Sequence, residues 1–288
     1  MLSGPQPIPA GACEKEGDKF KGSSGYRLIP GNTCNRERGL KKDAPKWKDC
    51  SEGQASGGKV SHQRFDFPAT ITEHAYFGES KTLLAYTSDN SVWLTMNEGF
   101  SWKRILEEET FVASTMHAYS KDRAYLFTKG KTVYYTTDKG LTWNKFTAPL
   151  EPNSLGIGLL DFHPTQPDWL IWTGSRDCTS GTSATCHTTA YYSKDHGRNW
   201  KEIDSYVRTC TWGRDRRFKI DERTIFCESY SQKSGSQRSA DATSMQFVRG
   251  GNFYANKQVV FPSIVGFATF EEYMVVAEVS QDPSQIRH

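Results

Sequence analysis

Long hydrophobic runs are missing from this 288-residue sequence. The most apolar window, residues 259–270, contains Pro262 and runs into Glu271 and Glu272, whereas a membrane helix needs about 20 apolar residues. Residues 1–5 also lack the charged start and apolar centre of a signal peptide. The covered chain therefore predicts neither a membrane helix nor a secretory leader.

An excess of charge of one sign is absent as well. The 36 basic and 33 acidic residues leave a net charge of +3, whereas nucleic-acid binders usually concentrate basic residues on one face. The HExxH, GxSxG and P-loop patterns do not occur either. We therefore predict no nucleic-acid partner, no cofactor and no metal site.

The cysteines indicate an oxidising compartment. There are seven, none in a CxxC pair, which is the usage expected of disulfide partners. Cys13, Cys34 and Cys50 lie in residues 1–58, a stretch rich in Gly, Pro, Lys and Ser that needs disulfides for order. At least one of these three must pair elsewhere or stay free. An odd cysteine count and the lack of a leader together predict missing sequence.

A turn motif, here called the Asp box, occurs three times. The Asp or Asn is expected to accept hydrogen bonds from N–H groups two or three residues on, and the Gly to supply a positive φ. The Trp then opens the returning strand with a ring to bury. We therefore interpret these residues as structural turn locks and not as catalytic acids. The positions are Thr95, Asn97, Gly99 and Trp102 in box one, Thr136, Asp138, Gly140 and Trp143 in box two, and Ser193, Asp195, Gly197 and Trp200 in box three.

From residue 59 onward short alternating strands follow one another without helical periodicity. Repeats of about 40 to 50 residues with four strands each predict an all-β domain over residues 59–288, a partial β-propeller of about four and a half blades. The expected strands are 74–77, 82–86, 92–95 and from 102; 115–118, 124–127, 132–136 and from 143; 158–162, 169–172, 189–193 and from 200; 208–211, 224–229 and 244–248; and, in a fifth unit where the chain stops, 264–270 and 273–279.

Four of the cysteines are predicted to form two disulfides. The spacing of the box tryptophans rises from 41 to 57 residues, and most of the excess lies in a loop that carries Cys178 and Cys186 near its ends. A bridge between them would remove the added conformational freedom. Cys210 and Cys227 fall on neighbouring strands, where Cβ atoms come within about 5 Å. A zinc site at Cys178, Cys186 and His187 lacks a fourth ligand at the usual spacing, so the disulfide is the simpler interpretation.

Four stretches carry a resemblance to the sortilin family, and to its fungal vacuolar protein sorting receptors above all. Residues 13–50, with the run 20–34 inside them, resemble the second half of the cysteine-rich module that follows a propeller in that family. The other three stretches are residues 162–172, 224–229 and 246–256. The order, with the module end first and the propeller start second, resembles the junction between the two luminal repeats of a fungal receptor. Because the family's propellers have ten blades, the resemblance implies a partial chain.

The resemblance also implies a function. Such receptors are type I membrane proteins that cycle between late Golgi and endosome. They bind soluble vacuolar hydrolase precursors such as carboxypeptidase Y in the lumen and carry them without chemistry. Membrane attachment would come only through a C-terminal anchor beyond the residues present. No cargo-contact residues can be assigned from the resemblance.

Two alternatives stay open. A sialidase-like glycoside hydrolase would need an arginine cluster, a Tyr activated by a Glu and an Asp acid. Residues 27–30, Arg-Leu-Ile-Pro, resemble the Arg-Ile-Pro motif of such enzymes, but they lie in the cysteine-rich segment and contain an extra residue. The other alternative is an interaction propeller without a sorting role. We predict that the chain is not an enzyme.

Overall fold

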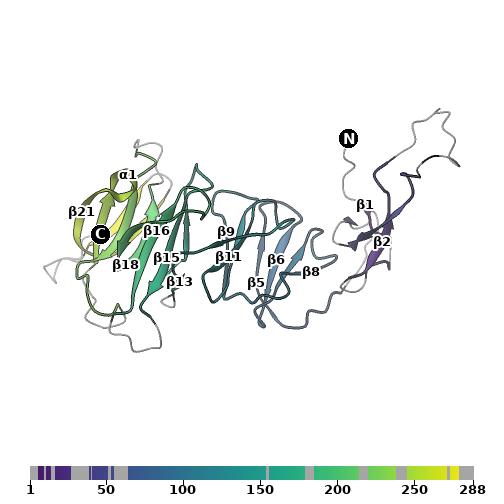
Figure 1. Ribbon diagram of the computed structural model, residues 1–288, viewed down its shortest axis with the longest axis horizontal. Coiled ribbons are helices and arrows are strands. Elements are labelled where there is room, and N and C mark those ends of the chain that lie inside the picture. Colours follow the sequence, from purple (N-terminus) through teal and green to yellow (C-terminus); the bar gives the residue numbers. More distant parts are fainter. Residues whose placement is uncertain are drawn as a thin grey trace. The chain divides into compact units, whose positions relative to one another are not determined.

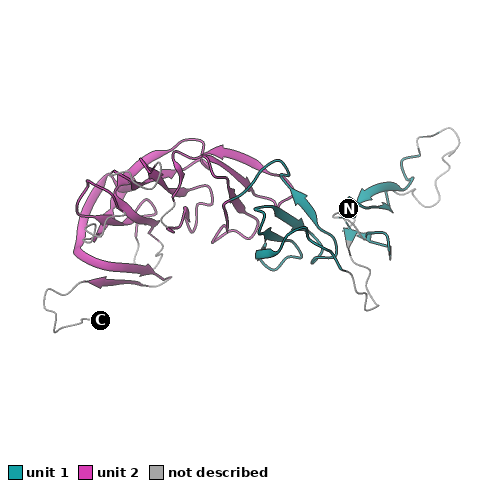
Figure 2. Ribbon diagram, turned by 90° about the horizontal axis from the view of Figure 1, so that it is seen from below, with its two compact units in different colours: residues 1–111 teal, residues 112–288 magenta. Residues whose placement is uncertain are grey.

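The computed structural model describes residues 6–9, 11–13, 17–26, 39, 41–50, 53–54, 64–153, 156–178, 185–213, 220–237, 245–270 and 273–278. The chain forms two compact units, Met1–Phe111 and Val112–His288 (Figure 2). Within the described residues, no helix is long and apolar enough to cross a membrane. Cys34, residues 27–30 and the predicted boundary between residues 58 and 59 lie outside the described residues.

The N-terminal part of unit 1 is a small disulfide-held module. β1 (Gln6–Pro7) pairs in parallel with β4 (Gly53–Gln54), and β2 (Lys19–Gly22) pairs antiparallel with β3 (Lys46–Asp49). The module core consists of Ile8, Phe20 and the Cys13–Cys50 disulfide, whose Cα atoms are 5.9 Å apart. A core this small depends on its covalent bridge for order.

Blades one and two are four-stranded antiparallel sheets whose strands follow chain order. Blade one, in unit 1, contains β5 (Ile71–Tyr76), β6 (Leu83–Thr87), β7 (Val92–Thr95) and β8 (Lys103–Ile105). Blade two, in unit 2, contains β9 (Ala113–Met116), β10 (Ala124–Phe127), β11 (Thr132–Thr136) and β12 (Asn144–Thr147). The strands lie within about three residues of the predicted positions, which confirms the repeat as a blade.

Blade three has a longer central hairpin than predicted. Its strands are β14 (Leu160–Phe162), β15 (Leu170–Arg176), β16 (His187–Ser193) and β17 (Lys201–Ser205), and β13 (Glu151–Pro152) pairs with the far end of β15. Pairing extends out to Arg176 and His187, next to the Cys178–Cys186 disulfide. Part of the inserted sequence therefore lengthens the hairpin.

Blade four contains β18 (Val207–Trp212), β19 (Ile225–Tyr230), β20 (Met245–Gly250), β21 (Asn256–Thr269) and β22 (Met274–Glu278) (Figure 1). The predicted fifth unit is not a separate sheet. The first part of β21 pairs with β20 and its last part pairs with β22, so the strand runs through both. Pro262 lies where the register with β20 shifts, a position where its missing N–H costs no ladder bond.

Two hydrophobic cores of unit 2 lie between successive blades. Leu170 and Trp172 pack against blade two, while Ile171 between them packs against blade four, because alternate residues of a strand point to opposite faces. Both faces of β15 are therefore buried, and its sequence is continuously apolar at this point. The sheets confirm the predicted all-β class, with blade four ending in five strands.

Candidate functional site

Box two shows how the turn is held. The Thr136 hydroxyl accepts hydrogen bonds from the N–H groups of Asp138 (3.3 Å) and Gly140 (2.8 Å) and donates to Oδ1 of Asp138 (2.8 Å). Oδ1 also accepts the Thr142 N–H at 2.9 Å, and Oδ2 accepts the Thr142 hydroxyl at 2.6 Å. The N–H bound by the Asp138 carboxylate thus lies four residues on, and not two or three, because the Thr136 hydroxyl takes the Gly140 N–H and the Asp138 carbonyl takes the Leu141 N–H. Gly140 has the expected positive φ of 84°.

Box three repeats this geometry with different donors. Ser193 donates to Oδ1 of Asp195 at 2.8 Å and accepts the Gly197 N–H at 2.8 Å. Asn199 replaces the threonine, since its N–H and its side-chain amide donate to the two carboxylate oxygens at 2.9 and 2.6 Å. Burial alone would raise the pKa of Asp138 and Asp195, but these bonds outweigh it and hold each pKa below its usual value. Both carboxylates are committed to their turns.

Box one differs at the apex. Oδ1 of Asn97 accepts from the Thr95 hydroxyl and the Ser101 N–H, both at 2.9 Å. Nδ2 of Asn97 donates to the Ser101 hydroxyl at 3.0 Å and to the carbonyls of Cys50 and Gly53, both at 3.3 Å. The asparagine therefore keeps the turn and adds contacts to the cysteine-rich module within unit 1.

The box tryptophans lie one residue before their strands, at half-buried positions. The Trp102 ring meets Phe67 edge-on, with ring centroids 5.0 Å apart. The Trp200 ring packs on Phe146 of blade two, with centroids 5.8 Å apart. These rings are packing residues, as the repeat predicts.

The residue after the box Asp or Asn has a role that the sequence did not reveal. It has a positive φ and donates its N–H to a carbonyl two residues before the second strand of its own blade. Phe253 in α1 (Gly251–Tyr254) does the same in blade four, so this blade keeps the contact without an Asp box. The bonds are Glu98 to Lys81 (2.9 Å), Lys139 to Asp122 (3.0 Å), His196 to Asp168 (3.0 Å) and Phe253 to Arg223 (2.8 Å).

In three of these pairs the side chains also interact. Two are ion pairs, and in the third a histidine lies beside a carboxylate. Lys81 and Glu98 lie 3.8 Å apart, Asp122 and Lys139 lie 3.3 Å apart, and Nδ1 of His196 lies 3.1 Å from Asp168. In boxes one and two the partners are 17 residues apart in sequence. Complementary charge at that fixed offset is the signal that could have found them.

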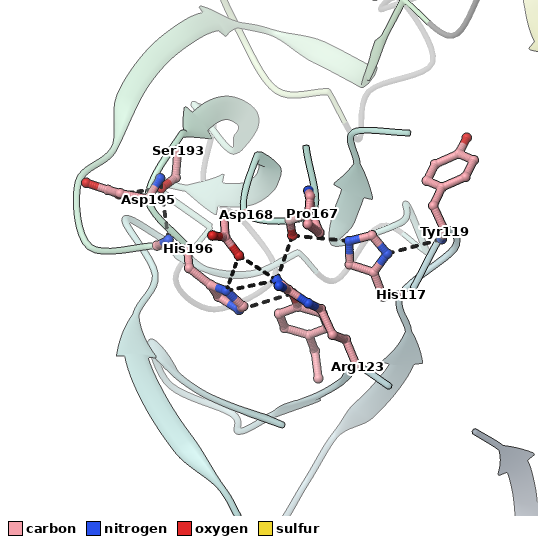
Figure 3. A network of polar contacts seen from close by, with 10 residues as sticks. His117, Tyr119, Arg123, Pro167, Asp168, Ser193, Asp195 and His196 are labelled. Carbon is pink, nitrogen blue, oxygen red and sulfur yellow. Dashed lines mark hydrogen bonds and ion pairs between the residues drawn. The ribbon is translucent and has the colours of Figure 1, made fainter. Parts of the chain in front are cut away.

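The third pair belongs to a polar network between blades two and three (Figure 3). Nη1 of Arg123 donates to the Pro167 carbonyl at 2.9 Å and to Oδ1 of Asp168 at 2.6 Å. The Tyr125 hydroxyl lies 3.2 Å from Nε2 of His196. Burial favours the neutral imidazole and lowers the pKa of His196, although Asp168 opposes the shift. The network joins blades and presents no free nucleophile.

Stacked rings also connect blade three to blade two and blade four to blade three. His196 lies on Tyr135 of blade two, with ring centroids 4.1 Å apart, and Phe253 lies on Tyr192 of blade three, with centroids 5.1 Å apart. Each tyrosine directly precedes the Thr or Ser of its own box. The residue after one box position therefore packs on the strand that leads into the preceding box.

Two histidines connect their own blade to the next blade in the chain. Nδ1 of His117 accepts the Tyr119 N–H at 3.1 Å, and Nε2 donates to the Pro167 carbonyl at 3.3 Å. His163 accepts from Gln166 at 3.0 Å and donates to the Glu222 carbonyl at 2.9 Å in the same way. Burial lowers the pKa of both imidazoles, that of His117 to about 4. Both rings are neutral, since a proton on Nδ1 would face an N–H donor.

The structure makes the two disulfides that the sequence predicts. Cys178 and Cys186 are joined with Cα atoms 4.4 Å apart, and Cys210 and Cys227 are paired directly across β18 and β19 with Cα atoms 4.1 Å apart. His187 stacks on Tyr206, with ring centroids 4.1 Å apart. The sulfurs of Cys178 and Cys186 are therefore bridged, and neither is a thiolate ligand.

A Tyr–Glu–Arg group on blade three was not predicted. The Tyr191 hydroxyl donates to Oε2 of Glu202 at 2.9 Å, and Arg176 contacts both side chains. Burial, and then the Glu202 carboxylate, raises the pKa of Tyr191, which disfavours the phenolate. The three residues lie on the second to fourth strands of the blade. The arrangement is a cross-strand ladder with one arginine.

A cavity of about 630 Å³ lies between β18, β19, β21 and β22. On its wall Glu228 accepts the Phe267 N–H at 3.0 Å and lies 3.7 Å from Arg208. Burial raises the pKa of Glu228, while Arg208 and the Phe267 bond oppose that shift. The cavity combines a buried carboxylate and a half-exposed guanidinium with apolar strand residues.

Comparison with known proteins assigns this chain to a family. The Sortilin-Vps10 profile, described as sortilin, neurotensin receptor 3, matches residues 90–288. The chain belongs to the Sortilin-Vps10 family. Over 96% of its length this Sortilin-Vps10 chain is 47% identical to a vacuolar protein sorting/targeting protein 10 of Mycosarcoma maydis and 48% identical to that of Laccaria bicolor. It spans about a fifth, 19%, of the length of these relatives. A YCF48 structure from Cyanidioschyzon merolae is 11% identical with a TM-score of 0.38, over 77% of this chain and 71% of that one.

Proposed function

We propose that this chain is a luminal segment of a vacuolar sorting receptor, which binds soluble hydrolase precursors such as that of carboxypeptidase Y and travels between late Golgi and endosome. The observation that carries the proposal is the match of 96% of the chain to proteins named for vacuolar protein sorting and targeting. Family membership over residues 90–288 supports it as well. The committed box carboxylates support a role in binding without chemistry.

A binding measurement tests the proposal. A hydrolase propeptide labelled with a fluorophore is titrated with the disulfide-intact chain at neutral pH, and a scrambled propeptide serves as the control. Saturable binding of the native propeptide alone is the expected result. Equal binding of both peptides would indicate an interaction propeller without cargo selectivity, and no binding would place the cargo site elsewhere in the receptor.

The second candidate function is a glycoside hydrolase, and within the part of the chain that the structure describes the Tyr191–Glu202–Arg176 group is the feature that favours it. A sialidase needs several arginines around the substrate carboxylate, and the raised pKa of Tyr191 weakens it as a nucleophile. We expect no sialic acid release from a fluorogenic substrate. Release that Glu202→Gln abolishes and Glu73→Gln leaves intact would establish the enzyme and overturn the receptor proposal.

A further inference from the structure

The apex of box one is buried, whereas the corresponding residues of the other boxes are half-buried or exposed. Asn97 and Ser101 are buried, at 5% and 8% exposure. Their counterparts in box two are the half-buried Asp138 and the exposed Thr142, and Asn199 of box three is also exposed. The turn is the same in all three boxes, so the difference comes from what lies over the apex.

The cover is the cysteine-rich module of the same unit. The carbonyls of Cys50 and Gly53 lie 3.3 Å from Nδ2 of Asn97. Phe100, two residues before the box tryptophan, packs against the module core around the Cys13–Cys50 disulfide. Leu141 holds the equivalent position in box two and is 67% exposed. A polar contact and an apolar contact therefore both join box one to the module.

Only an amide can make this polar contact while it keeps the turn. The Ser101 N–H can only donate, so the atom of Asn97 that accepts it is the oxygen, and the other terminal atom is the NH2 group. That group supplies protons to carbonyl oxygens. An aspartate at residue 97 would keep the Oδ1 contacts, as Asp138 does, but would set a negative oxygen against two carbonyl oxygens. The exchange of Asp for Asn thus matches the chemistry of the cover.

We propose that box one is the docking point of the cysteine-rich module, and that the asparagine at residue 97 determines this docking. The occupant is the module, which meets the asparagine through the carbonyls of Cys50 and Gly53. Gly53 suits the position because a Cβ there would come within 2.2 Å of Ile8. The disulfide at Cys50 ties the docking carbonyl to the module core. Box one then serves as a joint between domains, in addition to closing its hairpin.

The test is Asn97→Asp in the whole chain, with Asp138→Asn as the matched control. Hydroxyl-radical footprinting by mass spectrometry reads the solvent exposure of Phe100, and hydrogen exchange reads the Ser101 amide. In Asn97→Asp we expect the oxidation rate of Phe100 to rise several-fold, toward that of Leu141, while the Ser101 amide stays protected. Asp138→Asn should leave Phe100 unchanged.

Two results would overturn the proposal. An unchanged Phe100 oxidation rate in Asn97→Asp would show that the amide does not hold the module. Loss of Ser101 protection together with Phe100 exposure would show that the asparagine is needed for the turn itself and has no separate docking role. The same footprint on Cys13→Ser/Cys50→Ser gives the fully undocked value for Phe100.

Discussion

Boxes one and two share one backbone turn but differ in what their apex meets. In box two both oxygens of Asp138 bind donors of the turn itself. In box one a single atom changes, and the NH2 group of Asn97 reaches two carbonyls of the cysteine-rich module. The comparison teaches that a turn residue can keep its local role while its second polar atom is reassigned to a long-range partner.

Removing the module disulfide should have the largest effect on this comparison. Closing 37 residues, the Cys13–Cys50 bridge is worth about 4 kcal/mol in the chain-entropy account, against about 2.5 kcal/mol for the 8 residues of Cys178–Cys186. Cys13→Ser/Cys50→Ser should therefore unfold the module and expose box one. Urea denaturation of this variant and of Cys178→Ser/Cys186→Ser, after peptide mapping without reduction, measures the difference. Equal midpoints would contradict the prediction.

Alanine substitution at the two apex positions should have the next largest effect, and the loss of stability should differ between the two boxes. Asp138→Ala removes three hydrogen bonds of a half-buried turn and should cost about 2 kcal/mol. Asn97→Ala removes the turn bonds and also leaves the carbonyls of Cys50 and Gly53 without this donor, for about 3 kcal/mol. Hydrogen exchange of peptides from each blade checks the order. A larger loss in box two would show that the module contact adds no stability.

The pH dependence should distinguish blade two from blade one. The pKa of His117 is lowered to about 4 by burial, while the bond to the Pro167 carbonyl opposes the shift, and Phe77 holds the equivalent place in blade one. The unfolded chain binds the proton first, at the ordinary histidine pKa of 6.5. The stability that the neutral His117 contributes is therefore complete above pH 6.5, declines as pH falls and is fully lost below about 4. At pH 5 the loss should be about 1 to 2 kcal/mol.

Urea denaturation at pH 7 and pH 5 measures this loss, and His117→Phe, which copies blade one, is the control. The variant should lose less stability between the two pH values than the native chain. The same pH sensitivity in the variant would assign the titration to other groups, such as His163, whose pKa is also lowered by burial.

The smallest effects should come from the ion pairs beside the boxes. Lys81–Glu98 is exposed and 3.8 Å long, so a double-mutant cycle should give at most about 0.5 kcal/mol. Arg123–Asp168 is 2.6 Å long and the arginine is 16% exposed, so its coupling should be about 1 kcal/mol. Coupling that disappears in 0.5 M salt for Arg123–Asp168 would show that it behaves as a surface pair.

Much of the site could be predicted because its chemistry is local. The bonds of Thr136 and Ser193 span two to four residues, and the Cys178–Cys186 loop is closed over eight. The inter-blade contacts could not be predicted in this way. His117 and His163 bond to main-chain carbonyls 50 and 59 residues away, and a carbonyl leaves no mark in the sequence.

The sequence by itself determined the strand and turn pattern, the family and the residues that lock each hairpin, because alternation, Asx and Ser/Thr hydrogen bonding and a positive φ at Gly depend on neighbours in the chain. Only the tertiary structure decided that β21 runs through two pairings and that Arg123 crosses to Asp168. It also decided that the amide of Asn97 lies under the carbonyls of Cys50 and Gly53. These features depend on which backbone atoms packing brings together, and one residue's type does not encode its distant partner.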